Sequence, residues 1–271
     1  MYMKNKPLIS VIMSEYNTNI ELLKESIKSI LDQTYDNFEL IIIDDCGKND
    51  VKKISDEFND ARIKVHKNGK NSGLVYSLNT ALEKSTGKYI ARMDTDDYSY
   101  PDRLEKQVKF MEKNQKYDII GGNANLYNGK EIWGTTSGHG EINTKKMLDG
   151  CPLIHPSVMY KKKTIMDIGG YLNYNRCEDY ATWIEAIVHG YNMYKMDDIV
   201  IRYHLSKEDY KKRTLKTRKG FFKMLKYQYI KLKPTKIKLY KMYLKTFLAG
   251  IIPKRVMYEY HKRKCIINEE N

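Results

Sequence analysis

The first hundred residues alternate between short apolar runs and segments whose apolar residues recur at helical spacing. The runs typical of strands are Leu8–Met13, Phe38–Ile43, Ile63–His66 and Tyr89–Met93. The segments typical of helices begin after Asn19, cover Val51–Phe58, and contain Leu74, Leu78, Ala81 and Leu82. Phe38–Ile43 is almost continuously apolar, as in a strand that is buried on both faces. These repeated strand-helix-strand units predict an α/β fold with a mostly parallel sheet flanked by helices.

Polar residues follow three of the predicted strands at the point where each strand ends. They are Ser14-Glu15-Tyr16-Asn17, Asp44-Asp45 and Asp94-Thr95-Asp96-Asp97. In open sheets of this kind, ligands bind beyond the carboxyl ends of the strands. We therefore expect the three groups to converge on one binding edge.

Asp94, Asp96 and Asp97 suggest a cation site. Crowded carboxylates repel one another and raise each other's pKa unless a positive group lies between them. Asp94 and Asp96 are two residues apart, so on an extended backbone both point to the same side. Their oxygen atoms suit Mg²⁺ or Mn²⁺. The alternative is a solvated loop with a turn before a helix that starts near Pro101. Asp97 is expected either to support the residues that bind the cation or to cap that helix.

A second acidic pair, Glu178 and Asp179, precedes apolar residues at helical spacing. These apolar residues are Trp183, Ile184, Ile187 and Val188. The pair therefore lies in the first turn of an amphipathic helix, where acids are favoured by the helix dipole even without a chemical role. The sequence alone leaves a structural and a catalytic role open.

At 271 residues the chain is long enough for one large domain. Several classes of protein are disfavoured by features that the chain lacks. We expect no secretory signal and no membrane span, because no apolar run is long enough. Four scattered cysteines indicate reduced thiols in a cytosolic protein. No GxGxxG follows the first strand and no GxxxxGK[ST] occurs, which argues against nicotinamide dehydrogenases and P-loop NTPases.

Positive charge is concentrated near the C-terminus. Between Lys207 and Lys264, 20 basic residues face three acidic ones, so this segment carries +17 of a chain with net charge +14. Two apolar stripes recur there at helical spacing among the lysines: Phe221, Leu225, Tyr229 and Leu232, then Tyr240, Leu244, Phe247 and Leu248. Basic amphipathic helices suit an anionic membrane surface. Packing on the body or on a second copy in a homo-oligomer, and binding of nucleic acid, are the alternatives.

The ordered motifs of the chain resemble those of the inverting nucleotide-sugar glycosyltransferases of family 2, which have the GT-A fold. The resemblance covers Pro7 to Ser206. It rests on Ser10–Asn17, Ser29–Tyr35, Ile41–Asp45, Asn71–Leu74 with Asn79, Asp94–Asp97 with Pro101–Leu104, His155–Met159 and Glu178–Tyr180. We therefore expect a GT-A catalytic domain over residues 1–206 and a basic helical C-terminal region over 207–271.

The resemblance implies a nucleotide site and a metal site. Asp45 matches the carboxylate that binds the base, and Ser14 and Tyr16 match residues that line the nucleotide pocket. Asp94 and Asp96 match the DxD carboxylates, the first near the ribose and both near the metal. His204 falls where many members place a histidine that reaches the diphosphate or the metal, with a structural histidine as the alternative.

The resemblance also implies the chemistry. Asp179 matches the general base that activates the acceptor, and Glu178 is expected to position the acceptor. Inversion needs only one such base and no covalent intermediate. The Gln-x-x-Arg-Trp motif of processive synthases is absent, so we expect a single addition. His155 is expected to be packed or on the acceptor side, and Arg103 to be structural.

The sequence and the resemblance together predict a function with several parts. We expect transfer of one sugar, from UDP rather than another nucleotide, with Mn²⁺ or Mg²⁺ as cofactor. The expected acceptor is a lipid-linked saccharide in bacterial capsule or lipopolysaccharide synthesis, and the expected location is cytoplasmic, on the inner face of the membrane. We expect no nucleic-acid partner. A nucleotidyltransferase is the other enzyme alternative, although the glycine-rich triphosphate loop is missing.

Overall fold

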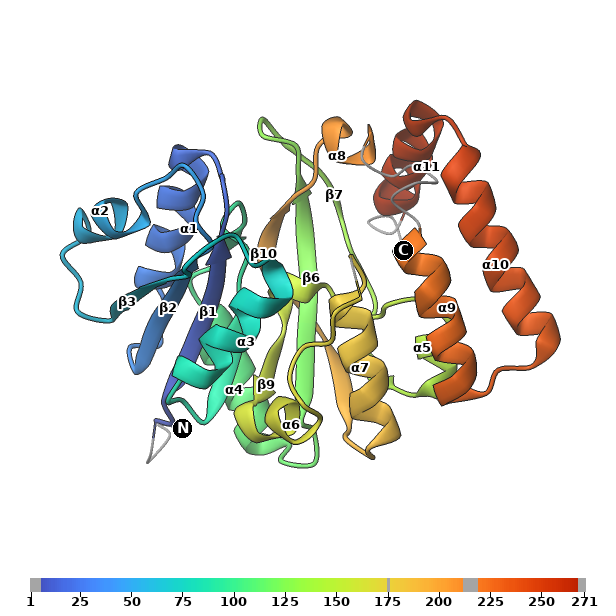
Figure 1. The fold of residues 1–271 in the computed structure, drawn as a ribbon, viewed down its shortest axis with the longest axis horizontal. Coiled ribbons are helices and arrows are strands. Elements are labelled where there is room, and N and C mark those ends of the chain that lie inside the picture. The colour runs from blue at the N-terminus through green and yellow to red at the C-terminus, as the bar shows by residue number, and fades with distance from the viewer. Residues whose placement is uncertain (1–5, 175, 212–218, 268–271) are drawn as a thin grey trace.

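The computed structural model describes residues 6–174, 176–211 and 219–267. These residues form a ten-stranded mixed sheet flanked by helices (Figure 1). The strands are β1 (Ile9–Glu15), β2 (Phe38–Asp44), β3 (Ile63–Lys67), β4 (Tyr89–Arg92), β5 (Tyr98–Ser99), β6 (Ile119–Tyr127), β7 (Ile132–Thr135), β8 (Gly140–Ile142), β9 (Met159–Lys161) and β10 (Met193–His204). The helices of the body are α1 (Ile20–Leu31), α2 (Val51–Asp56), α3 (Leu74–Lys84), α4 (Arg103–Lys113), α5 (Thr144–Asp149), α6 (Lys162–Asp167) and α7 (Glu178–Val188).

The first four strands form the parallel half of the sheet, in the order β3-β2-β1-β4. Each strand and each intervening helix lies where the hydrophobic pattern predicts it, with ends that differ by at most two residues. The side chain of Asn19 caps α1 by accepting from the backbone N–H groups of Glu21 and Leu22. The α/β prediction is therefore confirmed for this half.

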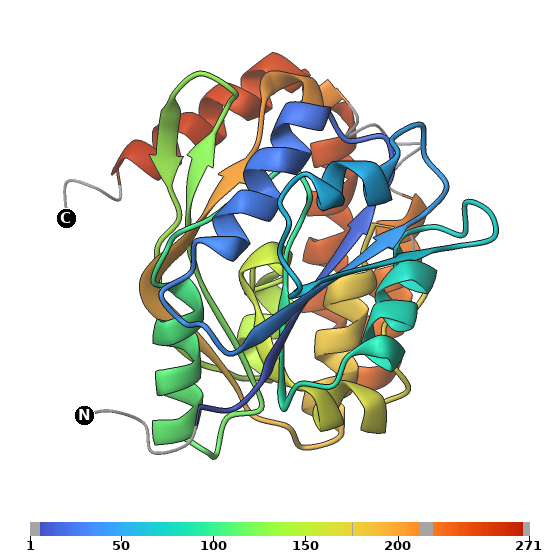
Figure 2. The ribbon, with the colours of Figure 1, turned by 90° about the vertical axis from the view of Figure 1, so that its left-hand side faces the viewer.

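The second half of the sheet is mixed. β9 lies between β4 and β6 and is antiparallel to both, while the long β10 runs parallel to β6. Each face of the sheet has its own hydrophobic core: α1, α2 and α4 cover one face, and α3, α5, α6 and α7 cover the other (Figure 2). Adjacent strand residues alternate between the two cores, as Val11 and Ile12 do. The carboxyl ends of β1, β2 and β4 consequently lie together at one edge.

Over its described residues, 207–211 and 219–267, the C-terminal region packs on the body as helices α8 (Lys207–Lys211), α9 (Lys219–Leu232), α10 (Lys236–Ile251) and α11 (Lys254–Ile267). α9 contacts α7 and α5, α10 lies outside α9, and α11 returns to β7 and α8 (Figure 1). The predicted domain boundary at residues 206 and 207 stays a prediction, and it falls between β10 and α8.

The predicted apolar stripes of this region differ in their burial. Leu225 of α9 is buried, but Tyr229 is exposed, and Met224 and Gln228 complete the buried face instead. On α10 the stripe stays exposed, and two of its residues, Leu244 and Leu248, border a cavity between the C-terminal helices and the body. Packing on the body, the alternative to membrane binding, therefore holds for α9 and not for the outer face of α10. Among the described residues, no helix combines the length and apolar character needed to cross a bilayer.

Glu39 ties three elements together at the opposite end of the sheet from the acidic clusters. Its buried carboxylate accepts from Ser10 Oγ at 2.6 Å, from Thr86 N at 2.7 Å and from Lys64 Nζ at 2.5 Å. Burial alone would raise the pKa of Glu39, but these hydrogen bonds outweigh it and hold the pKa at about 2. The ionised carboxylate therefore links β1, β2 and the turn that enters β4.

We expect Glu39→Gln to lower the free energy of unfolding by about 1–2 kcal/mol at pH 7, since charge-assisted hydrogen bonds are lost. The folded-state pKa is depressed, so this stabilisation is present above the ordinary pKa of 4.5 and is lost as the pH falls toward 2. Urea unfolding at several pH values measures it. The matched control is Glu57→Gln, which removes an exposed ion pair with Lys24. A gap between the two variants that persists unchanged at pH 2 would contradict the assignment.

Candidate active site

A cavity of about 1030 Å³ opens at the carboxyl edge of the sheet. Its wall is formed by the start of α3, the end of β4, the segment around the 3₁₀ turn His155–Ser157, and the start of α7. Asp94, Glu178 and Asp179 all border it. Two acidic groups that are far apart in the sequence are thus brought to one site.

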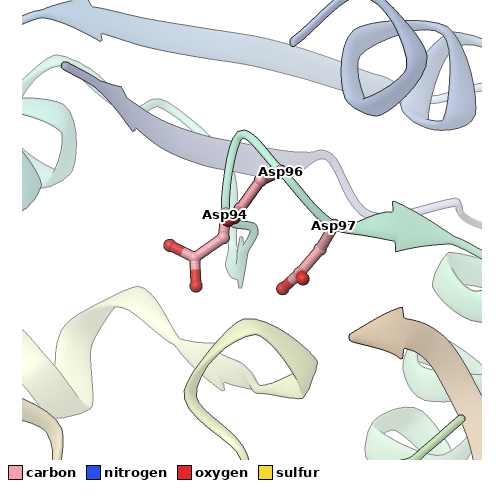
Figure 3. A group of neighbouring side chains, drawn as sticks. All are labelled: Asp94, Asp96 and Asp97. Atoms are coloured by element: carbon pink, nitrogen blue, oxygen red, sulfur yellow. The ribbon is translucent and has the colours of Figure 1, made fainter. Parts of the chain in front are cut away.

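Asp94, Asp96 and Asp97 form a compact carboxylate cluster directly after β4 (Figure 3). One oxygen atom of each lies within 4.8 Å of the others. The sequence pattern predicted an extended backbone at this point. Instead, Thr95 and Asp96 form a turn. The turn, rather than strand alternation, brings the three side chains together. Asp97 is buried while the Asp96 side chain is 45% exposed, and the cation site stays a prediction.

Arg92 is a site residue that the sequence analysis missed. Its buried guanidinium donates to both carboxylate oxygens of Asp94, each at 2.5 Å. Burial raises the pKa of Asp94 and Asp96 adds to the rise, while Arg92 opposes it. The available signal was spacing, because residues 92 and 94 are separated by two positions at the end of a strand. A ribose or a metal that contacted Asp94 would therefore bind a carboxylate that already pairs with Arg92.

Asp97 and His204 complete the cluster from the neighbouring strand β10. Asp97 Oδ1 accepts from the backbone N–H of His204 at 2.7 Å, and His204 Nδ1 lies 3.7 Å from Asp96 Oδ2. Burial, with the charges of Asp94 and Asp96, raises the pKa of Asp97 well above its usual range. Asp97 does not cap α4, which begins after Asp102. The cap alternative is therefore wrong.

The cluster fits a divalent cation. Within the described residues, Asp97 Oδ2 is buried and accepts no hydrogen bond. A buried carboxylate oxygen of this kind is costly unless a partner is present. Two further carboxylates and an imidazole lie beside it, and such oxygen and nitrogen donors are the ligands that Mg²⁺ and Mn²⁺ accept.

Of the four residues predicted for the nucleotide, Asp94 borders the cavity, while Ser14, Tyr16 and Asp45 are not among the described residues that line it. Asp45 is buried and accepts from the backbone N–H groups of Ser72 and Gly73, both at 2.8 Å. It thereby fixes the loop that enters α3, where Gly73 has a φ of 86°. Ser14 is half-buried and Tyr16 is 53% exposed. Their roles toward a nucleotide stay predictions.

Glu178 and Asp179 form the first turn of α7, as predicted, and both face the cavity. Burial raises the pKa of Asp179, and burial together with Asp179 raises the pKa of Glu178. The Cys151 thiol donates to Asp179 Oδ2 at 3.6 Å. A carboxylate whose pKa is raised is a stronger base than an ordinary one, which suits proton abstraction near neutral pH.

His155 and Arg103 also behave as expected. His155 packs against Tyr171 and Trp183 and still borders the cavity, so it is both packed and close to the proposed acceptor side. Burial lowers the pKa of His155 well below its usual range, and nearby Arg92 lowers it further. Arg103 is fully buried and donates to the carbonyl of Arg92 at 2.8 Å, which is a structural contact.

Comparisons with known proteins agree with this geometry. The family model described as Glycosyl transferase family 2 matches residues 10–170. The chain is 31% identical to EpsE of Bacillus subtilis (strain 168), which is named a glycosyltransferase, over 99% of this chain and 98% of that protein. It is 32% identical to the Escherichia coli UDP-Glc:alpha-D-GlcNAc-diphosphoundecaprenol beta-1,3-glucosyltransferase WfaP, over 68% of this chain and 71% of WfaP.

A solved structure shows the same fold. It is the mannosyltransferase PcManGT from Pyrobaculum calidifontis in complex with GDP-Man and Mn²⁺, which superposes with a TM-score of 0.64 at 15% identity. The match covers 97% of this chain and 81% of that one. The predicted GT-A architecture, a mostly parallel sheet flanked by helices with helices at the C-terminus, is confirmed.

We expect Asp94→Asn to lower the free energy of unfolding by about 2–4 kcal/mol, because it leaves the buried Arg92 guanidinium without its counter-charge. The Arg92 side chain is 3% exposed, whereas that of Asp94 is 32% exposed. The matched control is Asp96→Asn, which removes a charge from the same cluster at a 45% exposed side chain and should change stability by about 0.5 kcal/mol or less. Urea unfolding in EDTA measures both. Equal losses in the two variants would contradict the role of Arg92.

Proposed function

Because this chain belongs to glycosyl transferase family 2, we propose that it transfers one sugar from a nucleotide-sugar to an acceptor hydroxyl with inversion at the anomeric carbon. Inversion is typical of the family. Membership favours glycosyl transfer over the nucleotidyltransferase and nucleic-acid alternatives.

One observation carries the proposal: a single cavity is bordered by Asp94 of the carboxylate cluster and by the pair Glu178 and Asp179. Inverting transfer requires a group that stabilises the departing diphosphate and a base beside the attacking hydroxyl, both within reach of one sugar. The cluster after β4 supplies the first requirement and the start of α7 supplies the second.

The roles follow from the positions. Asp179 accepts the proton of the acceptor hydroxyl as that oxygen attacks the anomeric carbon, and Glu178 orients the acceptor. Ser14, Tyr16, Asp45 and Asp94 bind the nucleotide, with Asp94 held in place by Arg92.

Asp96, Asp94 and His204 would hold the divalent cation, Mn²⁺ or Mg²⁺. When bound, such a cation neutralises negative charge on a departing nucleoside diphosphate. The fit of the carboxylate cluster supports this part of the proposal, and PcManGT was solved with Mn²⁺.

The donor and acceptor are inferred from the relatives. WfaP is named for UDP-Glc and a diphosphoundecaprenol-linked acceptor, and TuaG of Bacillus subtilis for teichuronic acid biosynthesis. We extend this chemistry to the present chain as UDP-sugar donor, lipid-linked saccharide acceptor, and a role in bacterial surface polysaccharide synthesis such as capsule or lipopolysaccharide.

The outer face of α10 supports a peripheral location on the inner face of the cell membrane. Its exposed apolar residues include Ile237, Tyr240, Phe247 and Ile251. Leu244 and Leu248 are also exposed but border a cavity between α10 and the body, and the exposed Lys236 lies at the start of the helix. A helix of this kind binds anionic lipid through apolar burial and charge together.

We expect Asp179→Asn to lower kcat by about 10²–10⁴-fold, because the near-isosteric amide cannot accept the hydroxyl proton. Asp96→Asn should abolish the metal-dependent part of the activity. The measurement is release of nucleoside diphosphate from a panel of nucleotide-sugars with Mn²⁺, Mg²⁺ or EDTA, in the presence of an acceptor extract. Asp197→Asn, an exposed carboxylate outside the cavity lining, is the control and should retain full activity.

Each result of this assay supports or contradicts a different part of the proposal. Turnover of one donor that requires metal and collapses in both variants supports the assigned roles and identifies the sugar. Full activity of Asp179→Asn would remove Asp179 as the base. Failure to bind or turn over any nucleotide-sugar, with any metal, would overturn the proposal.

We expect the protein to bind vesicles of phosphatidylglycerol and to bind those of phosphatidylcholine much more weakly. The double variant Phe247→Gln/Ile251→Gln should reduce binding by about tenfold or more, because two exposed apolar side chains no longer enter the bilayer interface. Vesicle co-sedimentation measures it. Ile132→Gln, an exposed apolar residue of β7, is the control. Equal binding by the double variant and the wild type would exclude α10 as the membrane contact.

A further inference from the structure

A second cavity, of about 760 Å³, lies between the C-terminal helices and the body. Apolar side chains of α9, α10 and α11 form most of its wall, including Leu225, Leu248 and Met257. The end of α5 with the segment that follows it, and Tyr180 of α7, form the rest. Several wall residues are exposed apolar side chains, such as Leu244 and Val256, so the cavity is open to the surface.

The two cavities share a wall beside the proposed base. Residues 148–151 border the second cavity, and residues 153–156 border the first. Cys151 faces the second cavity, and its Sγ lies 3.6 Å from Asp179 Oδ2, while Asp179 borders the first. A molecule held in the second cavity therefore has its nearest route to the catalytic carboxylate along this segment.

Positive charge lies at the border between the second cavity and the body. Lys238 pairs with Asp149 at the end of α5, and Lys241 and Lys245 follow on the same face of α10. Lys241 and Lys245 both border the cavity, and the pKa of Asp149 is lowered chiefly by Lys238 and also by the charge of Lys245. An apolar cavity with these ammonium groups in its wall is complementary to a lipid with an anionic head.

We infer that the second cavity binds the isoprenoid chain of a polyprenyl-diphosphate acceptor, with Lys241 and Lys245 beside its diphosphate. This inference rests on the proposed function. The second cavity combines an apolar wall with two lysines and shares a wall with the site of Asp179, which suits a ligand that joins an apolar chain, a diphosphate and a sugar. A diacyl phospholipid lacks the saccharide that would extend along residues 148–156 to the base, so we assign the cavity to the acceptor and not to a bilayer lipid.

Calorimetric titration with farnesyl diphosphate in EDTA tests the inference independently of catalysis. We expect it to bind at least tenfold more tightly than inorganic diphosphate or dihexanoyl phosphatidylglycerol. Ala249→Trp should fill the cavity and Lys241→Gln/Lys245→Gln should remove the head-group contact, each weakening binding by at least tenfold. Leu248→Gln, at a more exposed position of the cavity wall, should likewise weaken the binding of farnesyl diphosphate. Ile132→Gln, an exposed apolar residue of β7 outside the cavity lining, is the control.

Three results would overturn the inference. They are equal binding of farnesyl diphosphate and inorganic diphosphate, displacement of farnesyl diphosphate by UDP, or tighter binding of the phospholipid. If any of these occurs while the wild type still turns over a nucleotide-sugar, the proposed function stands and only the acceptor subsite is lost. If farnesyl diphosphate binds as expected but no nucleotide-sugar is turned over, the transferase proposal fails and the lipid site remains.

Discussion

The pairing of Arg92 with Asp94 is the interaction on which the catalytic edge depends. Three carboxylates lie within a few ångströms of one another after β4, and burial makes each charge expensive. Arg92 lies beneath them, almost wholly enclosed, and it is itself held by the strand and by Arg103 through its backbone carbonyl. The buried guanidinium lowers the pKa of Asp94 against burial and the charge of Asp96, which both raise it. Arg92 and the buried Arg103 lie near the three acidic side chains, and a divalent metal would add further positive charge there.

The parallel half of the fold was predictable from the sequence because its signals are local. Strand runs and helical spacing alternate without interruption, and the polar residues at each strand end mark the binding edge. The same regularity made Asp94 and Asp96 identifiable before their neighbours were known, whereas the roles of Glu178 and Asp179 were predicted from the family resemblance. Their convergence on one cavity required the tertiary structure, because the two pairs come from β4 and α7, which are joined by the mixed half of the sheet.

What the sequence did not reveal depends on contacts between distant segments. β9 is only three residues long and gives almost no periodic signal, yet it joins the two halves of the sheet. Arg92 lies in the apolar run Tyr89–Met93, and its two-residue spacing from Asp94 is the only local signal for their pairing. The buried face of α9 was misplaced by one position, since Met224 and Gln228 pack inward while Tyr229 does not. Asp45 was predicted to contact the base, but its contacts with Ser72 and Gly73 arise from loop geometry that spacing cannot encode.

The strand β10 lies between the carboxylate cluster and the start of the C-terminal helices. His204 ends the strand next to the carboxylate cluster, and α8 begins only three residues later. α9, α7 and α5 are packed against one another, so α10 keeps a set distance from Asp179. On a bilayer that holds α10, the attacking hydroxyl would have to lie at one height above the lipid surface. The distance between the lipid surface and Asp179 would then select acceptors by the length of their glycan. A glycan that is too short or too long would place a different sugar residue at the base.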